Sequence, residues 1–324
     1  MKKYLLTGGA GFIGSHTADA LLLRGDTVVV LDDLSTGRAE NFVQHMGNPR
    51  FNFIQGSILD EELLMEATSQ VDEVLHFAAA VGVFNIVNNP LGSLATNIWG
   101  SENVLNAAKK FKKPAMMAST SEIYGKNTKD GLLETDDRIL GEATKARWSY
   151  SEAKAIEEVM AYAYWKEFEV ETRIIRFFNT VGPRQVGRYG MVVPRFVESA
   201  MKNEDITVYG TGEQTRCFGH VQDIVRGVLL IIDSSKTIGE AINLGNRKEI
   251  SIKGLAENII EKTASKSRIV YIPYEEAYEE GFEDMQRRVP NAEKAKRLVG
   301  WQAELDLNQI IDDVAADFAS RLAK

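Results

Sequence analysis

A glycine-rich segment near the N-terminus constrains the fold more than any other part of the chain. Thr7-Gly-Gly-Ala-Gly-Phe-Ile-Gly14 follows a short apolar run, Lys3–Leu6, and precedes an amphipathic stretch, Ser15–Arg24. The run predicts a strand and the stretch predicts a helix. Glycines at this spacing permit a tight turn whose backbone can approach a pyrophosphate at the helix N-terminus. We therefore expect a dinucleotide-binding βα unit, with a tight turn that binds no ligand as the alternative.

The turn supplies the first predicted cofactor contacts. Its glycines satisfy the dinucleotide fingerprint in two ways, starting at Gly8 or at Gly9, because Gly11 and Gly14 complete both triplets. We expect contacts from the glycines and from the residues that open the helix: Gly8, Gly11, Phe12, Ile13 and Gly14.

Two acidic residues end the second predicted strand, Thr27–Leu31. Asp32, eighteen residues past Gly14, is followed by Asp33. An acid at this place binds ribose hydroxyls and repels a 2′-phosphate, which favours NAD over NADP. Arg38 is close enough in sequence to leave NADP open. An FAD enzyme has the same fingerprint, and the tyrosine–lysine pair described below argues against it.

Short apolar runs and amphipathic stretches alternate through the first half of the chain, which indicates βαβ units. Further strands are predicted at Phe51–Ile54, Val74–Phe77, Ala115–Ala118 and Thr172–Phe177, with helices at Asn97–Phe111 and Ser149–Glu167. The strands are continuously apolar, as strands buried on both faces are. The predicted fold class is α/β, a Rossmann-type doubly wound parallel sheet.

The alternation weakens after about Asn179. We expect a loop at residues 182–189, a last strand of the main sheet at Ala241–Leu244, and helices at Ser251–Thr263 and Leu307–Leu322 in a smaller C-terminal lobe. The two lobes should interleave. Residues 1–178 with about 216–245 are predicted to form the dinucleotide-binding domain, and about 179–215 with 246–324 the nucleotide-sugar-binding lobe.

Bulk composition argues against several classes of function. The net charge of −8 provides no basic surplus for nucleic acid. No apolar run approaches the ~20 residues that cross a bilayer, and the four histidines lack metal-ligand spacing. We therefore expect no nucleic acid, membrane or metal as partner. One cysteine, Cys217, permits no intrachain disulfide, which fits a reducing compartment and predicts a cytoplasmic protein.

Tyr150-Ser-Glu-Ala-Lys154 places a phenol and an ammonium on the same face of a predicted helix. Tyrosine is a poor base near neutrality because its free pKa is about 10. A neighbouring Lys⁺ favours the phenolate, which can take a proton from a substrate hydroxyl as hydride leaves the same carbon. A solvated helix face has the same spacing, but here the pair follows a dinucleotide fingerprint and several βα units.

A second polar group follows the predicted strand Ala115–Ala118. Ligands of doubly wound sheets bind at the carboxyl ends of strands, so Thr120, Ser121 and Glu122 are predicted to lie beside the substrate. Thr120 would exchange a hydrogen bond with the hydroxyl that Tyr150 deprotonates. Ser121 and Glu122 would be additional acid/base groups beside the sugar, with a surface location as the alternative for Glu122.

Four motifs occur together: the glycine turn, Ser119-Thr-Ser-Glu-Ile-Tyr-Gly125, Tyr150-x-x-x-Lys154 and Arg176-Phe-Phe-Asn-Thr-Val-Gly-Pro-Arg184. They resemble the extended short-chain dehydrogenases/reductases known as the NAD-dependent epimerase/dehydratase family. Val208-Tyr-Gly-x-Gly-x-Gln-Thr-Arg216 and Arg288-Val-Pro-Asn continue the resemblance over nearly the whole chain. It implies an enzyme that binds NAD and a nucleoside-diphosphate sugar between its lobes and oxidises one sugar hydroxyl transiently.

The resemblance also implies individual contacts. The implied substrate contacts are four polar side chains beyond residue 178: Asn179, Arg188, Arg216 and Arg288. The resemblance places Asn179, Arg216 and Arg288 near the pyrophosphate. Asp60 and Ala78 would contact the cofactor. Ser57 stands where family members often have an adenine-contacting Asp, so that contact is in doubt.

Family reactions begin with oxidation at sugar C4. Epimerases then return the hydride to the other face, dehydratases expel water, and decarboxylases release the C6 carboxylate of a glucuronate as carbon dioxide. Ser121 stands where 4,6-dehydratases usually have an acidic Asp. Thr120-Ser-Glu122 and Arg288-Val-Pro290 are similar to UDP-glucuronate decarboxylases, whereas Thr180-Val-Gly-Pro-Arg-Gln185 and the segment 188–195 are similar to UDP-sugar 4-epimerases.

We therefore expect decarboxylation of a UDP-glucuronate-type sugar, with a UDP-sugar 4-epimerase as the alternative and a 4,6-dehydratase behind both. A non-catalytic NAD-binding protein is the remaining alternative, because a fold alone does not establish a function. Family analogy also implies a homodimer in which Asn97–Phe111 and Ser149–Glu167 pair with their copies, although the apolar stripes of these helices would equally suit packing on the sheet.

Overall fold

The computed structural model describes residues 1–82, 89–187, 191–273, 285 and 287–322. Its centre is a seven-stranded sheet in the order β3-β2-β1-β4-β5-β6-β11, and all neighbouring strands are parallel. The strands are β1 (Lys3–Thr7), β2 (Thr27–Asp32), β3 (Phe51–Gln55), β4 (Glu73–His76), β5 (Ala115–Thr120), β6 (Thr172–Phe177) and β11 (Ala241–Leu244). The strand order reverses direction between β1 and β4, which in doubly wound sheets is the ligand-binding position.

Helices cover both faces of this sheet, which confirms the predicted Rossmann-type α/β fold. Side chains alternate between the faces along each strand: Tyr4 and Leu6 enter one core, and Leu5 enters the other. Because both faces are covered, the strands consist mainly of apolar residues, although the edge strand β3 carries the exposed Asn52 and Gln55.

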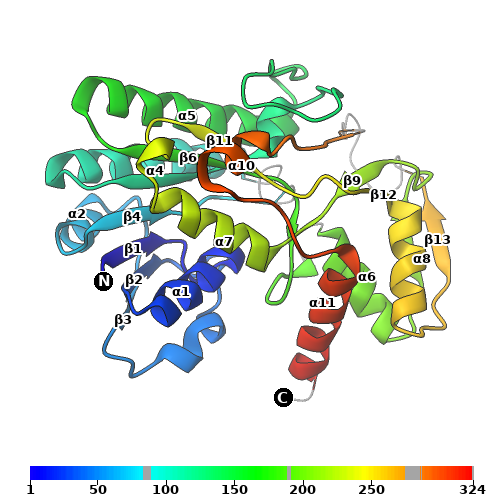
Figure 1. Cartoon of the computed structure of the whole chain (residues 1–324). Coiled ribbons are helices and arrows are strands. Elements are labelled where there is room, and N and C mark those ends of the chain that lie inside the picture. Colours follow the sequence, from blue (N-terminus) through cyan, green and yellow to red (C-terminus); the bar gives the residue numbers. More distant parts are fainter. Residues whose placement is uncertain (83–88, 188–190, 274–284, 286, 323–324) are drawn as a thin grey trace.

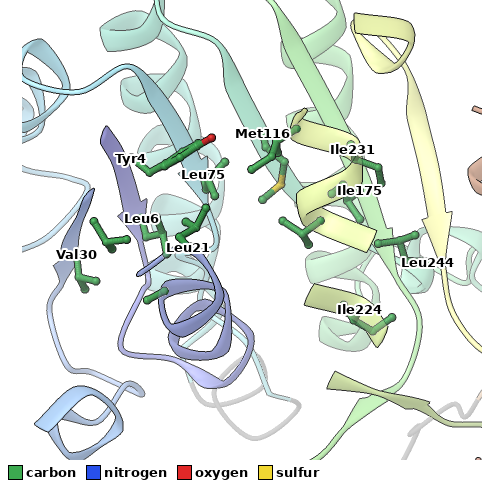
Figure 2. Close-up of a cluster of buried hydrophobic side chains, with 14 of the residues drawn as sticks. Tyr4, Leu6, Leu21, Val30, Leu75, Met116, Ile175, Ile224, Ile231 and Leu244 are labelled. Carbon is green, nitrogen blue, oxygen red and sulfur yellow. The ribbon is translucent and has the colours of Figure 1, made fainter. Parts of the chain in front are cut away.

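The first face is covered by α1 (Phe12–Arg24), α7 (Val221–Ile232) and α10 (Glu293–Val299). Figure 2 shows how side chains from β1, β2, β4, β5, β6 and β11 meet those of α1 and α7 in this core; the labelled residues are Tyr4, Leu6, Leu21, Val30, Leu75, Met116, Ile175, Ile224, Ile231 and Leu244. The second face is covered by α2 (Glu61–Ser69), α4 (Pro90–Phe111) and α5 (Ser149–Phe168), and α4 and α5 lie side by side (Figure 1).

A separate hydrophobic cluster lies in the C-terminal half, at the right of Figure 1. It is built by α6 (Val192–Met201), α8 (Ile252–Lys262), α11 (Leu307–Leu322) and β8 (Ile206–Tyr209), which pairs with β13 (Ile269–Ile272). The predicted boundaries between the two lobes stay a prediction. Ala295 and Trp301, which we assigned to the C-terminal lobe, pack in the core of the main sheet.

Shorter elements connect these units. They are η1 (Ala39–His45), η2 (Ser121–Tyr124), η3 (Ala146–Trp148), η5 (Ser235–Thr237), β7 (Thr180–Val181), β9 (Thr215–Cys217), β10 (Gly219–His220) and β12 (Glu249–Ser251). Of the helices in the described residues, none is both long enough and apolar enough to cross a bilayer.

Two helices begin earlier than their sequences predict. Helix α1 begins at Phe12 instead of Ser15, so Gly14, a poor helix former, lies inside its first turn. Helix α4 begins at Pro90 instead of Asn97, because Asn89 caps it by accepting a hydrogen bond from Gly92 N. A proline suits the first turn of a helix, since the N–H that it lacks has no partner there.

Candidate active site

The glycine turn between β1 and α1 is in close backbone contact with its surroundings. Gly8 has φ +70°, and a Cβ at Gly8 would lie 2.5 Å from Ala78 N. A Cβ at Gly14 would lie 2.4 Å from Gly8 O. At Gly9, by contrast, the nearest atom would be a Val30 side-chain carbon at 2.7 Å. The strictest backbone demands of the fingerprint therefore fall on the triplet that begins at Gly8.

Helix α1 begins without a side-chain cap. Gly11 is its N-cap residue, and Gly11 N donates to Gly8 O at 3.1 Å. The first N–H groups of a helix have no partner within it and carry the positive end of its dipole. Phe12, Ile13 and Gly14 contribute such groups here, so the turn is suited to hold an anion such as a pyrophosphate.

The two acids after the glycine turn differ in their surroundings. Asp32 is buried, and its carboxylate accepts hydrogen bonds from Ala10 N at 2.9 Å and Leu34 N at 2.8 Å. Burial raises the pKa of Asp32, although these two hydrogen bonds oppose the shift. Asp33 is exposed and accepts hydrogen bonds from the backbone and hydroxyl of Ser35. Asp32 therefore holds the glycine turn in place, and a ribose contact by either acid stays a prediction.

The segments after β3 and β4 are also fixed by hydrogen bonds. Asp60 is the N-cap of α2, and its side chain accepts a hydrogen bond from Leu63 N at 3.1 Å. This structural role is separate from the predicted cofactor contact of Asp60, which stays a prediction. The Asn97 side chain forms two hydrogen bonds with the backbone of Ala80, at 2.8 and 3.2 Å. Asn97 thereby fixes the strand end that contains Ala78. This role of Asn97 is not predicted by the sequence pattern.

Tyr150 and Lys154 lie in the first turns of α5, as predicted. Lys154 is 1% exposed, and its Nζ donates to Ala118 O and to Glu157 Oε2, both at 2.8 Å. Tyr150 is half-buried. Burial raises the pKa of Tyr150, and the carboxylates of Glu122 and Glu157 raise it further. In these surroundings the phenol form is favoured, so a nearby positive charge is needed to obtain the phenolate.

The predicted group after β5 lies next to the start of α5. Thr120 Oγ1 accepts a hydrogen bond from Glu122 N at 3.2 Å and so begins η2. Ser151 Oγ donates to Glu122 O at 2.9 Å, which ties η2 to α5. Ser121 is 2% exposed. The structure thus brings Thr120, Ser121 and Glu122 together with the helix that carries Tyr150.

Glu122 lies against two arginines. Arg147 Nη1 donates to Glu122 Oε2 at 2.6 Å, and Arg288 Nη1 lies 3.6 Å from Glu122 Oε1. Burial raises the pKa of Glu122, but the charges and hydrogen bonds of the two arginines outweigh burial and lower the pKa to about 2. A carboxylate with so low a pKa carries no proton near neutral pH. Glu122 is therefore unsuited to donate a proton at that pH, and its predicted role as a base stays a prediction.

Arg288 also reaches the end of β6. Its Nη2 donates to Asn179 Oδ1 at 2.7 Å, and Asn179 Nδ2 donates to Cys217 O at 3.2 Å. Two predicted substrate contacts that are far apart in sequence are therefore hydrogen-bonded to each other. The Arg288 side chain is 8% exposed and that of Glu122 is 22% exposed, so this group is partly open to solvent.

The other two predicted substrate contacts are Arg216 and Arg188. Arg216 lies on β9, and its Nη1 donates to Thr215 O at 2.8 Å. Arg188 lies outside the described residues. Substrate contacts by both arginines stay predictions.

Two charged residues of the site were not identified from the sequence. Arg147 lies three positions before Tyr150, and Glu157 lies three positions after Lys154. The position of Glu157 is a signal that was present, because residues three apart share a helix face. Arg147 comes from a short helix before α5, and helical spacing from Tyr150 does not predict its contact with Glu122.

Comparisons with known proteins agree with this arrangement. A sequence model of the family described as GDP-mannose 4,6 dehydratase matches residues 5–314. The chain belongs to this family. It is an extended short-chain dehydrogenase/reductase family, so the predicted family is confirmed.

Individual family members are similar over almost the whole chain. A UDP-N-acetyl-alpha-D-glucosaminuronate decarboxylase of Bacillus cytotoxicus is 40% identical over 309 residues, which is 95% of each chain. UDP-glucuronic acid decarboxylase 1 of Danio rerio is 36% identical over 323 residues, 99% of this chain and 73% of its own length. A solved structure of a Bacillus cereus UDP-glucuronic acid 4-epimerase mutant, in complex with UDP-4-deoxy-4-fluoro-glucuronic acid and NAD, has a TM-score of 0.86 at 25% identity and covers 98% of this chain and 99% of its own.

Proposed function

We propose that this family member is an NAD-dependent decarboxylase of a UDP-linked uronic acid sugar. The observation that carries the proposal is the convergence of Arg147 and Arg288 on Glu122. Two guanidinium groups approach the same carboxylate, so this part of the site brings together side chains that would suit a carboxylate of the substrate. Arginine suits that contact because its planar fork can bind both oxygens of a carboxylate. Relatives that act on acidic UDP-sugars support the same substrate class.

The glycine turn and the strand ends beside it fit NAD. The uncapped N-terminus of α1 would hold the pyrophosphate, and Asp32 or Asp33 would bind the ribose hydroxyls. When bound, NAD supplies the acceptor for the hydride that leaves sugar C4. The relative whose structure contains NAD supports this choice of cofactor.

In the proposed reaction, Tyr150 takes the proton of the C4 hydroxyl, and Thr120 positions that hydroxyl by a hydrogen bond. Lys154, fixed on Ala118 O, supplies the positive charge that the phenolate needs. Glu122 is fully ionised at working pH, so its role is to orient Arg147 and Arg288 rather than to donate a proton. Asn179 orients Arg288 from the opposite side.

Oxidation at C4 prepares the loss of the carboxylate. The C6 carboxylate of a 4-keto uronic acid is a β-keto acid, so its C5–C6 bond can break with release of carbon dioxide. The electron pair of that bond moves into an enolate. Arg147 and Arg288 would hold the carboxylate before it leaves, whereas the negative charge that develops on the C4 oxygen would be stabilised by Tyr150 and Thr120 beside it.

A UDP-sugar 4-epimerase is the second candidate. It would use the same Tyr150 and Lys154 but return the hydride to the opposite face of C4. The structural relative with 4-epimerase activity acts on an acidic sugar too, which keeps this candidate open. A 4,6-dehydratase is a weaker candidate because Ser121 is a poor acid for a leaving hydroxyl.

We further propose a homodimer formed through α4 and α5. Large apolar side chains are exposed on these two helices: Leu91, Trp99, Ile156, Val159 and Tyr162. Apolar side chains exposed on two neighbouring helices suit an interaction surface.

Residues 1–178 with about 216–245 would hold the cofactor, and about 179–215 with 246–324 would hold the sugar nucleotide. The single, buried Cys217 suits a reducing compartment such as the cytoplasm.

Product mass tests the reaction directly. The holoenzyme is incubated separately with UDP-glucuronate, UDP-N-acetylglucosaminuronate, UDP-glucose and UDP-N-acetylglucosamine. We expect a loss of about 44 Da from an acidic sugar only, which is the mass of carbon dioxide. A new isomer of unchanged mass would favour the 4-epimerase, and no change with any substrate would contradict both proposals.

A further inference from the structure

Five buried polar side chains form a continuous chain of hydrogen bonds behind the candidate site. Lys154 Nζ lies 2.8 Å from Glu157 Oε2, and Ser101 Oγ donates to the same oxygen at 2.7 Å. His76 Nε2 lies 3.0 Å from Ser101 Oγ, and Thr7 Oγ1 lies 2.7 Å from His76 Nδ1. All five are at most 1% exposed. The chain crosses α5, α4, β4 and β1 and ends next to the glycine turn.

The donors of this chain have one consistent direction. Ser101 donates to Glu157, so Ser101 Oγ must accept from His76 Nε2, and His76 Nδ1 must then accept from Thr7. This assignment requires a neutral His76. Burial holds the pKa of His76 well below its usual value, and the charge of Lys154 lowers it further. The chain therefore ends at the carboxyl group of Glu157, whose pKa is raised by burial, a shift that the Lys154 ammonium and the Ser101 hydrogen bond oppose.

Burial of the ion pair at the end of this chain of hydrogen bonds is unfavourable in free energy. The side chains of Lys154 and Glu157 are 2% and 0% exposed. Removing two charges from water costs several kcal/mol per ion, and apolar residues of similar size often give equal or greater stability. Stability therefore does not explain why residue 157 is a carboxylate. An effect of that carboxylate on Lys154 does explain it.

The contacts of Lys154 show what that effect is. An ammonium has three N–H groups, and two of them are held by Ala118 O and Glu157 Oε2. These two acceptors fix the direction of Nζ from opposite elements, β5 and α5. Tyr150 lies one helical turn earlier on the same helix face, and Glu157 is one of the two carboxylates that raise its pKa.

We propose that Glu157 is a positioning residue that acts on Tyr150 through Lys154. It fixes the lysine ammonium and, through its own charge, sets the protonation of the phenol. This inference rests on the proposed function, since it takes Tyr150 as the base. Among the described residues, the other titratable groups with an electrostatic effect on or from these three are His76 on β4, Glu122 on η2 and Glu158 on α5.

The main test is the pH profile of kcat for Glu157→Gln with the NAD-loaded enzyme. Glutamine keeps the size and an acceptor oxygen but removes the charge that raises the pKa of Tyr150. We expect the acid limb of the profile to move to lower pH by about one unit, with KM little changed. An acid limb at the wild-type position would overturn the proposal, because a purely structural residue leaves that limb in place.

Glu158→Gln is the matched control. It removes the same charge one residue further along α5, where Glu158 pairs with Arg176 at 2.7 Å. We expect its acid limb to stay at the wild-type pH. An equal shift in this variant would show a general charge effect and would overturn the specific role of Glu157.

Glu157→Asp covers the case in which Glu157→Gln does not fold. It keeps the charge but withdraws the carboxylate by one methylene, so we expect kcat to fall about tenfold or more, with KM preserved. A wild-type kcat would contradict positioning. Wild-type enzyme that turns over no acidic UDP-sugar would instead contradict the proposed function, so the two failures are distinguishable.

Discussion

Arg147 Nη1 lies 2.6 Å from Glu122 Oε2, and this ion pair joins the segment before α5 to the segment after β5. The Arg147 side chain is 9% exposed and that of Glu122 is 22% exposed. The pair therefore joins the two segments that adjoin Tyr150 and Thr120. Its charges determine what this part of the site can bind.

Removal of Arg147 should affect both stability and activity. Arg147→Met leaves Glu122 with only the more distant Arg288, so we expect a loss of about 2–4 kcal/mol of unfolding free energy, measured in urea. We expect kcat/KM for the acidic sugar to fall by about a hundredfold. Arg138→Met is the control, because Arg138 pairs with the exposed Glu152 at 3.0 Å. That surface pair should contribute less than about 1 kcal/mol, and equal losses in the two variants would contradict the account.

The Glu122 carboxylate should make stability depend on pH in a defined window. Its pKa is about 2 in the folded protein, against 4.5 ordinarily. A lowered pKa stabilises the folded state fully above the ordinary value, and the contribution is lost as pH falls towards the folded value. The difference in unfolding free energy between wild type and Glu122→Gln should therefore be largest near neutral pH and shrink between about pH 5 and pH 2. A difference that is constant over this range would contradict the assigned ion pair.

The glycine turn can be tested with a matched pair of variants. Gly8 and Gly300 have φ of +70° and +72°, but a Cβ at Gly300 would meet nothing within 4 Å. Gly300→Ala should cost only the backbone strain, about 1–2 kcal/mol. Gly8→Ala should cost more and should abolish NAD binding, measured by calorimetric titration. Equal stability and retained NAD binding in both variants would show that close packing at Gly8 is unimportant.

The proposed dimer surface predicts a change in mass in solution. Trp99 is 61% exposed on α4 and Val159 is 69% exposed on α5. The double substitution Trp99→Asp with Val159→Asp should convert a dimer to a monomer in light scattering after size exclusion, because it places charges in an apolar interface. Leu23→Asp, at a 91% exposed position on α1, should leave the dimer intact. A monomeric wild type would contradict the proposed homodimer.

Tyr150→Phe should separate chemistry from cofactor binding. The variant keeps the ring but lacks the hydroxyl, so we expect turnover to fall by at least about a thousandfold. NAD affinity should stay within a few-fold of wild type, because the turn at Gly8 is unchanged. Near-normal turnover would contradict the base assignment, and loss of NAD would indicate a structural role for the hydroxyl.

Strands were predicted well and helix starts less well, for a physical reason. The inner strands of the main sheet are buried on both faces, so their apolar runs, such as Val28–Leu31 of β2, are visible in the sequence. The start of α1 was missed because Gly14 is a poor helix former, and its place in the helix is decided by its contact with Gly8. The start of α4 was missed because it depends on the cap by Asn89. The apolar pattern of that helix does not show where the cap lies.

The candidate site was predictable where chemistry is local in sequence. Tyr150 and Lys154 share a helix, and Thr120 and Glu122 follow a buried strand, so their placement follows from spacing. The state of Glu122 was not predictable, because it depends on Arg147 and Arg288, which tertiary folding brings to it from separate segments. A pattern identifies a carboxylate, but only its neighbours determine whether that carboxylate carries a proton.

The fate of the sugar C6 carbon tests the central claim most directly. UDP-glucuronate labelled with carbon-13 at C6 is incubated with the NAD-loaded enzyme, and the headspace gas and remaining nucleotide sugar are analysed by mass spectrometry. We predict labelled carbon dioxide together with an unlabelled UDP-linked five-carbon sugar. Label retained entirely in a UDP-uronic acid with altered C4 configuration would contradict decarboxylation and assign the enzyme as a 4-epimerase.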